Sequence, residues 1–265
     1  MTMITSNSIL KYLMTKLSLK NHIKYRNDLK KYIEQCGDNK QFRYERRNRF
    51  QILGEWNEQA GDVGGDYFFQ DLYVAQQVSR AGIKHIYDIG SRIDGYIAHL
   101  LSMDIEVTML DVRPLKTKVD GLHFIQADAT TLSSIADDSL NAISSLHAIE
   151  HFGLGRYGDP VDYLGWKKAL LAMVRKVKKG GQIFLSVPVG DEEKLVFNAH
   201  RVFSPLSILK QVEKDVILSC FALIHEGKII EYHFDKAESA YEKLEKVVLP
   251  QLGNDDCGIF IMEKC

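Results

Sequence analysis

Short apolar runs rich in β-branched residues alternate with stretches of helical periodicity from about residue 82 onward. In residues 162–178, apolar side chains recur every three or four positions, and Gly180 and Gly181 follow as a stop signal. Strands that alternate with helices in this way favour a doubly wound, mostly parallel α/β sheet with helices on both faces. We predict further helices at residues 93–103 and 205–212, and strands at residues 85–89, 106–110, 122–125, 140–145, 182–187, 216–224, 228–234 and 258–263.

The composition is that of an ordinary globular domain. Apolar residues make up 45% of the 265 residues and charged residues 26%, which excludes fibrous and wholly disordered proteins. The longest apolar runs have the length of strands, whereas a membrane-spanning helix needs about 20 apolar residues. The four cysteines are scattered without a C-x-x-C pair, so they suit a reducing compartment and indicate neither a disulfide scaffold nor a zinc knuckle. We therefore interpret the protein as cytoplasmic.

Charge is unevenly distributed along the chain. The chain has 34 basic and 35 acidic residues. Residues 1–50 contain 12 of the basic residues but only 4 of the acidic ones. We predict a basic helical extension at residues 1–60 and an α/β domain at residues 61–265. Residues 9–17 have the apolar spacing of an amphipathic helix, so the extension would touch the inner membrane face or a protein partner, or it would fold as a solvated hairpin. Residues 1–8 resemble the vector-encoded leader of a β-galactosidase fragment and are left out of the fold prediction.

Small or acidic residues follow three successive predicted strands. Gly90 comes directly after the first strand and lets a ligand approach the backbone. Asp111 ends the second strand 21 residues later, close to the spacing at which an acid meets ribose hydroxyls. Asp128, followed by the small Ala129, ends the third strand, where a carboxylate could accept from an adenine amino group. The pattern predicts an adenosine site without phosphates, although each aspartate alone is explained equally well as a strand end or helix cap.

A dinucleotide site is an alternative interpretation of the same strand ends. The pyrophosphate of such a ligand needs a bare, glycine-lined helix start of the form G-x-G-x-x-G. Here Ser91, Arg92 and Ile93 fill that place. A nicotinamide oxidoreductase is therefore the weaker hypothesis.

Four segments carry a resemblance to a known family: residues 88–95, 144–160, 187–190 and 197–205. In these segments the chain is similar to the class I S-adenosylmethionine-dependent methyltransferases and, more closely, to the bacterial family labelled domain of unknown function 268, over about residues 65–209. The resemblance implies a seven-stranded Rossmann-like sheet and S-adenosylmethionine as the cofactor. It further implies O-methylation of a sugar, a sugar nucleotide or another precursor of a surface polysaccharide such as O-antigen.

The resemblance also implies cofactor contacts at the strand ends. These contacts divide among the methionine end, the sulfonium, the ribose and the adenine. They are Asp88, Gly90, Ser91 and Gly95 for the methionine end, Ser145 beneath the sulfonium, Asp111 for the ribose, and Asp128 and Ala129 for the adenine.

The chain departs from the wider superfamily in the first turn. Arg92 and Asp94 stand where relatives have glycines, so contact with the cofactor must be rebuilt around Gly90 and Gly95 or is lost. Asn141, at the start of the fourth strand, stands where relatives often have an acid. A non-catalytic binding protein with this fold therefore remains an alternative.

A proton acceptor is needed if the methyl acceptor is a hydroxyl group, and the residues after the fourth strand offer one. His147, Glu150 and His151 stand there. Histidine often serves as a general base because its pKa near 6.5 leaves it largely neutral. We predict His151 as the base, with His147 as the second candidate and Glu150 as a helper. Alternatively, one histidine only braces the loop through a backbone carbonyl.

The same residues 147–151 spell H-x-x-E-H, an inverted zinc-protease motif. Two ligands at this spacing need a third, and nothing singles out either Glu226 or Glu231 for that role. The motif also runs from a strand into a glycine-rich loop, which is poor context for an active-site helix. We therefore expect no metal in the site.

Asn198, His200 and Arg201 form a second candidate region after the fifth strand. An arginine fork binds phosphate or carboxylate groups, which suits a sugar nucleotide or an acidic sugar. Pairing of Arg201 with Asp191 or Glu192 explains the arginine equally well.

Residues 65–71 contain several aromatic side chains before the first strand. They would fold over the cofactor as a lid, or they would simply pack in the core. The expected partners are a small-molecule or glycan acceptor and, through the basic extension, the membrane or polysaccharide assembly proteins. Nucleic acid is not expected, because the acidic domain offers no groove that is both aromatic and basic.

Overall fold

The computed structural model describes residues 18–38, 42–57, 63, 65–235, 240–246 and 256–265. They belong to two units, Met1–Val63 and Gly64–Cys265, and each unit is described by itself. No helix in the described part of the chain is both long and apolar enough to cross a membrane.

The first unit contains one long helix, α2 (Leu19–Cys36). It begins at Ser18, whose hydroxyl oxygen accepts a hydrogen bond from the backbone nitrogen of Asn21 at 3.4 Å. It is followed by two 3₁₀ turns, η1 (Arg46–Asn48) and η2 (Glu55–Asn57). Residues 1–17, with the leader-like and amphipathic segments, lie outside the described residues, so attachment through this extension stays a prediction.

The second unit is built on a sheet of eight strands. They are β1 (His85–Ile89), β2 (Glu106–Asp111), β3 (Leu122–Gln126), β4 (Leu140–Leu146), β5 (Val177–Val189), β8 (Val216–His225), β9 (Lys228–His233) and β10 (Asp256–Lys264). Their order is β3-β2-β1-β4-β5-β10-β8-β9. The strands from β3 to β5 are parallel, and β10 lies antiparallel between β5 and β8. The predicted mostly parallel α/β sheet is confirmed.

The resemblance implied seven strands, whereas the sheet has eight, and the strand predicted at residues 228–234 is β9 at its edge. It pairs antiparallel with β8 through a two-residue turn formed by Glu226 and Gly227. Both residues have positive φ, 49° and 71°. A turn with positive φ at both central residues matches the twist of a hairpin, so the chain folds straight back onto β8.

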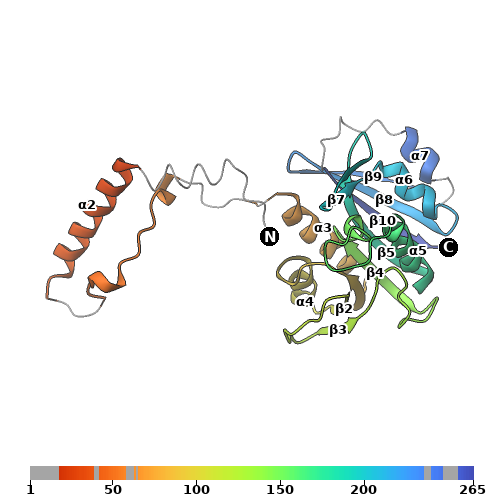
Figure 1. Ribbon diagram of the computed structural model, residues 1–265, viewed down its shortest axis with the longest axis horizontal. Coiled ribbons are helices and arrows are strands. Elements are labelled where there is room, and N and C mark those ends of the chain that lie inside the picture. The colour runs from red at the N-terminus through yellow and green to blue at the C-terminus, as the bar shows by residue number, and fades with distance from the viewer. Residues whose placement is uncertain (1–17, 39–41, 58–62, 64, 236–239, 247–255) are drawn as a thin grey trace. The chain divides into compact units, whose positions relative to one another are not determined.

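Helices cover both faces of the sheet (Figure 1). One group consists of α3 (Asp66–Arg80), the π-helical turn η3 (Ile93–Ile97) and α4 (Ala98–Ser102). The other group consists of α5 (Gly165–Lys176), α6 (Pro205–Val212) and α7 (Ala240–Lys246). Each group packs on its own cluster of buried apolar side chains. The helix predicted at residues 162–178 ends sooner than expected because Val177 already pairs with Leu140 of β4.

The strand order determines where a ligand can bind. From β1 the chain runs outward to β2 and β3, and it then returns to β4 on the opposite side of β1. The loops after β1 and β4 therefore diverge, and in doubly wound sheets a crevice forms at this point, outside the carboxyl ends of the strands. A separate hairpin of β6 (Lys194–Val196) and β7 (His200–Val202) follows β5.

Candidate functional site

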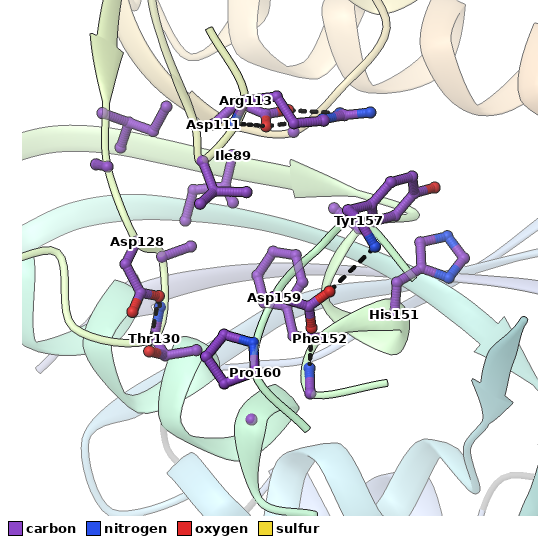
Figure 2. A pocket seen from close by; sticks show the side chains of 18 of the residues that line it. Ile89, Asp111, Arg113, Asp128, Thr130, His151, Phe152, Tyr157, Asp159 and Pro160 are labelled. Atoms are coloured by element: carbon purple, nitrogen blue, oxygen red, sulfur yellow. Dashed lines mark hydrogen bonds and ion pairs between the residues drawn. The ribbon is translucent and has the colours of Figure 1, made fainter. Parts of the chain in front are cut away.

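A cavity of about 220 Å³ lies at the carboxyl ends of the parallel strands (Figure 2). Its walls come from the segments that follow β1, β2, β3 and β4 and from the loop that leads into α5. The polar side chains that line it are Asp111, Arg113, Asp128, Thr130, His147, His151, Tyr157, Asp159 and Asp162.

Gly90, Asp111, Asp128 and Ala129, which the sequence analysis grouped as a nucleoside site, all line this one cavity. Gly90 has a φ of 72°, a conformation that glycine adopts without strain. A Cβ atom at this position would stand 3.2 Å from the Cβ of Ala148. Glycine therefore keeps the backbone of the first turn accessible from the cavity.

The carboxylate of Asp111 is held by Arg113. The backbone nitrogen and Nε of Arg113 donate to Oδ1 at 2.8 and 2.9 Å, and Nη2 donates to Oδ2 at 2.6 Å. The guanidinium also lies over the ring of Tyr157, 4.6 Å from its centroid. Only 9% of the Asp111 side chain is exposed. A ligand diol would therefore have to share this carboxylate with Arg113, a residue that the sequence analysis missed, or displace the guanidinium from it.

Asp128 orders its own turn after β3. Its Oδ1 accepts from the backbone nitrogen and the hydroxyl of Thr130 at 2.8 and 2.7 Å, as Figure 2 shows. Among the described residues, no hydrogen bond to Oδ2 is found, so this oxygen can accept from a ligand. The neighbouring Ala129 is buried and small, which leaves room for a planar ring beside it.

Asp88, Ser91 and Ser145 lie behind the cavity wall and do not line it. Asp88 is fully buried and accepts from the backbone nitrogen and hydroxyl of Ser91 at 3.0 and 2.8 Å and from the hydroxyl of Ser144 at 2.7 Å. Burial raises the pKa of Asp88 to about 6, against the opposing effect of these hydrogen bonds. Ser145 donates to the carbonyl of Ile89 at 3.3 Å. These residues fix the turn that presents Gly90 rather than facing a ligand.

Gly95 also lies outside the cavity lining and serves helix packing. A Cβ atom there would overlap Oδ2 of Asp71 on α3. Arg92 and Asp94, the departures from the usual glycine turn, form an exposed ion pair at 2.8 Å. The first turn therefore packs closely against α3 at Gly95, and the ion pair of Arg92 and Asp94 lies on its solvent-exposed side.

His147 lines the cavity and is braced from behind by Gln70 of α3. Its Nδ1 is hydrogen-bonded to Oε1 of Gln70, which also accepts from the hydroxyl of Ser186 at 2.6 Å and the thiol of Cys257 at 3.5 Å. Because Oε1 can only accept, Nδ1 of His147 carries the proton and Nε2 has the lone pair. Burial lowers the pKa of His147 to about 3, so the ring is neutral.

Gln70 comes from the segment that was interpreted as a lid or as core. No side chain of residues 65–71 lines the cavity, and Gln70 is buried. The ring of Tyr67 lies 5.1 Å from that of His147, centroid to centroid. The segment therefore packs against His147. The role of Gln70 could not be predicted from the sequence, because 77 residues separate it from His147.

His151 also lines the cavity, and its Nδ1 donates to the backbone carbonyl of Ala199 at 2.6 Å. This is the bracing contact that the sequence analysis kept as an alternative. Burial lowers the pKa of His151 to about 4. Its Nε2 lies 3.5 Å from Oε1 of Glu150, which is 1% exposed and whose Oε2 has no hydrogen-bond partner within the described part of the chain. Burial raises the pKa of Glu150 to about 8, so this contact joins two neutral groups and is not an ion pair.

The H-x-x-E-H run at residues 147–151 does not lie along one helix. Only η4 (Ile149–His151) is helical, and it is a single 3₁₀ turn. The Nδ1 atoms of both histidines are already engaged with Gln70 and Ala199. Because only η4 is helical, the run lacks the helix that carries a zinc-protease motif.

Asp159 organises the loop between η4 and α5. Its Oδ2 accepts from the backbone nitrogen of Gly153 at 2.8 Å, and its Oδ1 accepts from that of Tyr157 at 3.1 Å. Gly153 has a φ of 75°, and a Cβ atom there would overlap the carbonyl oxygen of Asp162. The glycines of this loop were expected from the sequence, whereas the role of Asp159 was not. The Gly-Asp-Pro run at residues 158–160 is the signal that could have revealed it.

The three residues proposed for acceptor binding lie on or beside the β6–β7 hairpin and do not line the cavity. They are Asn198, His200 and Arg201. Arg201 is buried, and its Nη1 donates to the carbonyls of Glu150 and Phe152 at 3.1 and 2.8 Å. Its guanidinium therefore stabilises the backbone around η4 and does not face a phosphate group in the cavity.

A family model described as "Caenorhabditis protein of unknown function, DUF268" matches residues 101–228. The number of this family is the one that the sequence motifs suggested. The description names Caenorhabditis, however, so the bacterial origin expected for the family is not supported. No protein with a curated description matches the sequence.

Solved structures of several methyltransferases are similar to this chain. The N-methyltransferase NodS from Bradyrhizobium japonicum WM9 matches with a TM-score of 0.50 and 10% identity over 76% of this chain and 99% of its own. A 1,6-didemethyltoxoflavin-N1-methyltransferase from Burkholderia thailandensis has a TM-score of 0.49 and 11% identity over 91% and 87%. A SAM-dependent methyltransferase from Archaeoglobus fulgidus has a TM-score of 0.48 and 19% identity over 75% and 100%. The similarity to NodS supports the class I methyltransferase fold.

Proposed function

We propose that this protein is an S-adenosylmethionine-dependent methyltransferase that acts on a hydroxyl group of a small acceptor. The observation that carries the proposal is that Gly90, Asp111 and Asp128, from three different strand ends, line one cavity together with His147 and His151. Nucleoside-binding groups and proton acceptors thus share a single space. The methyltransferase fold is consistent with this interpretation, but fold alone does not decide the reaction.

The donors and acceptors of the cavity fit a nucleoside that carries no phosphate. Two carboxylates stand at the end formed by β2 and β3, where they would repel a pyrophosphate but could accept from ribose hydroxyls and an adenine amino group. Asp128 has an oxygen available for such a bond, and Asp111 would offer its own once Arg113 gives way. The turn at Gly90 would then meet the methionine end. S-adenosylmethionine supplies an activated methyl group on a sulfonium.

His147 is the proton acceptor that the geometry favours. Transfer of a methyl group to a neutral hydroxyl leaves a proton that must be removed, and a histidine within hydrogen-bond reach can take it. The bond from Nδ1 to Gln70 leaves Nε2 of His147 with a lone pair. At His151, the corresponding Nε2 faces the protonated carboxyl of Glu150 at 3.5 Å. We therefore rank His147 before His151, the reverse of the order expected from the sequence.

The acceptor is proposed to be a sugar or a sugar-containing precursor. Its basis is the resemblance of the sequence motifs alone, because the description of the matching family model names no substrate. Because Asn198, His200 and Arg201 do not line the cavity, the acceptor would instead contact the loop at residues 152–165. Contact of the basic extension with an anionic membrane or with polysaccharide assembly proteins also remains a proposal.

Calorimetric titration with S-adenosylmethionine and S-adenosylhomocysteine tests the proposed cofactor. We expect one ligand per chain, and we expect Asp128→Asn to weaken binding because it removes a charged acceptor. The matched control is Asp120→Asn, a change at an exposed aspartate outside the cavity. Equal affinity of the two variants, or binding of NAD in place of both ligands, would contradict the proposal.

A non-catalytic binding protein is the second candidate, and the engagement of Asp111 by Arg113 favours it. Release of S-adenosylhomocysteine in the presence of a panel of sugar nucleotides separates the two. Turnover that His147→Ala abolishes, with cofactor affinity unchanged, identifies a methyltransferase. Cofactor binding without turnover on any acceptor identifies the binding protein.

A further inference from the structure

The β8–β9 hairpin brings together three side chains that the sequence keeps apart. Cys220 of β8 stands directly opposite His233 of β9, and Glu231 precedes His233 by two residues. Side chains two apart on a strand, and side chains directly opposite across a pair, point to the same face of a sheet. Cys220, Glu231 and His233 therefore share the face that α3 covers, where Cys220 belongs to the same buried cluster as Tyr73 of α3.

The potential ligand atoms of these residues lie close together. One atom each of the Cys220 thiol, the Glu231 carboxylate and the His233 imidazole all lie within 4.8 Å of one another. The Tyr73 hydroxyl donates to Oε1 of Glu231 at 2.6 Å and lies 3.7 Å from Sγ of Cys220. None of these residues lines the cavity of the candidate active site.

We propose that Cys220, Glu231 and His233 bind a divalent metal ion of the zinc class. The set combines sulfur, nitrogen and oxygen donors, which suits Zn²⁺ and its neighbours Co²⁺ and Ni²⁺, whereas Mg²⁺ and Ca²⁺ require oxygen ligands. Three protein ligands leave a fourth tetrahedral position for water or for the Tyr73 hydroxyl.

The three side chains differ in exposure, so an ion bound to them would have both a buried ligand and a route from solvent. Cys220 is 4% exposed, whereas 71% of the His233 side chain is exposed. An ion could thus enter from solvent at His233 and be held at the buried thiol. The ion would join β9, the outermost strand of the sheet, to β8. Its effect would be to hold an edge strand in place, independently of methyl transfer.

Cobalt binding to the full-length chain tests the site. After dialysis against EDTA, Co²⁺ is titrated while thiolate-to-cobalt charge-transfer absorption is recorded, and Zn²⁺ is then added as a competitor. We expect one Co²⁺ per chain with a thiolate band that Zn²⁺ removes. Cys220→Ser should abolish the band, and His233→Ala should weaken Co²⁺ binding by more than about tenfold, the lower range found for residues that only support a metal ligand.

Two matched variants control for nonspecific binding. Cys265→Ser removes an exposed thiol. His123→Ala removes an exposed histidine whose Nε2 lies 3.7 Å from Oε2 of Glu106, a pair that has no cysteine beside it. Both should bind Co²⁺ like the unaltered protein, and Zn²⁺ should raise their melting temperature but not that of His233→Ala. His233 and Glu231 are exposed, so His233→Ala and Glu231→Gln test the site even if Cys220→Ser unfolds. Absence of Co²⁺ binding, binding without the thiolate band, or unchanged affinity in His233→Ala would overturn the proposal.

Discussion

Replacement of Glu150 by glutamine should change how the stability of the protein depends on pH. Glu150 is 1% exposed, its Oε2 has no hydrogen-bond partner among the residues that the structure describes, and burial raises the pKa of its carboxyl to about 8. Glutamine has nearly the same shape but cannot ionise. The substitution therefore removes one titration while leaving the packing of the loop after β4 nearly intact.

The sign and size of the effect follow from proton linkage. In the unfolded chain a glutamate carboxyl keeps its ordinary pKa of 4.5, so between about pH 4.5 and 8 the folded protein holds a proton at Glu150 that the unfolded chain has released. The contribution of Glu150 to the free energy of unfolding is complete below about pH 4.5 and is lost as the pH rises toward about 8. One such proton changes the free energy of unfolding by about 1.4 kcal/mol per pH unit. From pH 5.5 to 7.5, the advantage of the unaltered protein over Glu150→Gln should therefore fall by up to about 3 kcal/mol.

Urea unfolding of both proteins at half-unit steps of pH measures this difference. The lowered pKa values of His147 and His151 destabilise the folded protein as the pH falls. This destabilisation is the same in both proteins, so it cancels in the difference between their free energies of unfolding. Glu213→Gln is the matched control, because Glu213 is exposed, and its difference from the unaltered protein should stay constant. If the Glu150→Gln difference also stays constant across this range, the carboxyl is not protonated in the folded state and the reasoning is refuted.

Three further predictions concern the walls of the cavity and the residues that support them. Arg113→Met should free Oδ2 of Asp111, leave Oδ1 with the backbone nitrogen of residue 113 as its donor, and tighten binding of S-adenosylmethionine in calorimetry; weaker binding would mean that the guanidinium itself contacts the ligand. Gly153→Ala should lower the free energy of urea unfolding by more than Gly158→Ala, because both have positive φ but only the first would overlap a carbonyl. The cost of the strained backbone alone is about 1 to 3 kcal/mol, and equal losses would refute the tight approach to Asp162. Gln70→Leu should slow methyl transfer while leaving the affinity for S-adenosylmethionine unchanged, since it removes the acceptor that orients His147, and the other two groups that bond to this acceptor, on Ser186 and Cys257, do not line the cavity; parallel losses of rate and affinity would indicate general disruption.

The sheet and the nucleoside end of the site could be predicted because they follow from local patterns. Alternating strands and helices specify the doubly wound arrangement, and any residue that ends a parallel strand comes to the same edge of the sheet. Gly90, Asp111 and Asp128 were found in this way. The same logic could not tell which strand-end residues face the cavity. Asp88 and Ser91 were expected to do so, but they are buried and hydrogen-bonded to each other.

The remaining site residues depend on contacts that no spacing reveals. Gln70 meets His147 from a helix 77 residues earlier, and Arg201 meets the carbonyl of Glu150 from a hairpin 51 residues later. Arg113 and Asp159 are local, but their roles come from loop geometry that the apolar pattern does not encode. The strand at residues 228–234 was predicted, but its pairing with β8 through the tight turn at Glu226 and Gly227 was not.

The position of β10 imposes an order on biosynthesis. This strand follows β9 in the chain but lies between β5 and β8 in the sheet. During translation, the β8–β9 hairpin can form as soon as it is made, yet it cannot join the parallel half until β10 has been synthesised. In that interval the hydrogen-bonding edge of β5 is bare, and such an edge invites pairing with other chains. Nascent chains stalled before residue 256 should therefore be the aggregation-prone species, and a chaperone that shields β5 would protect them.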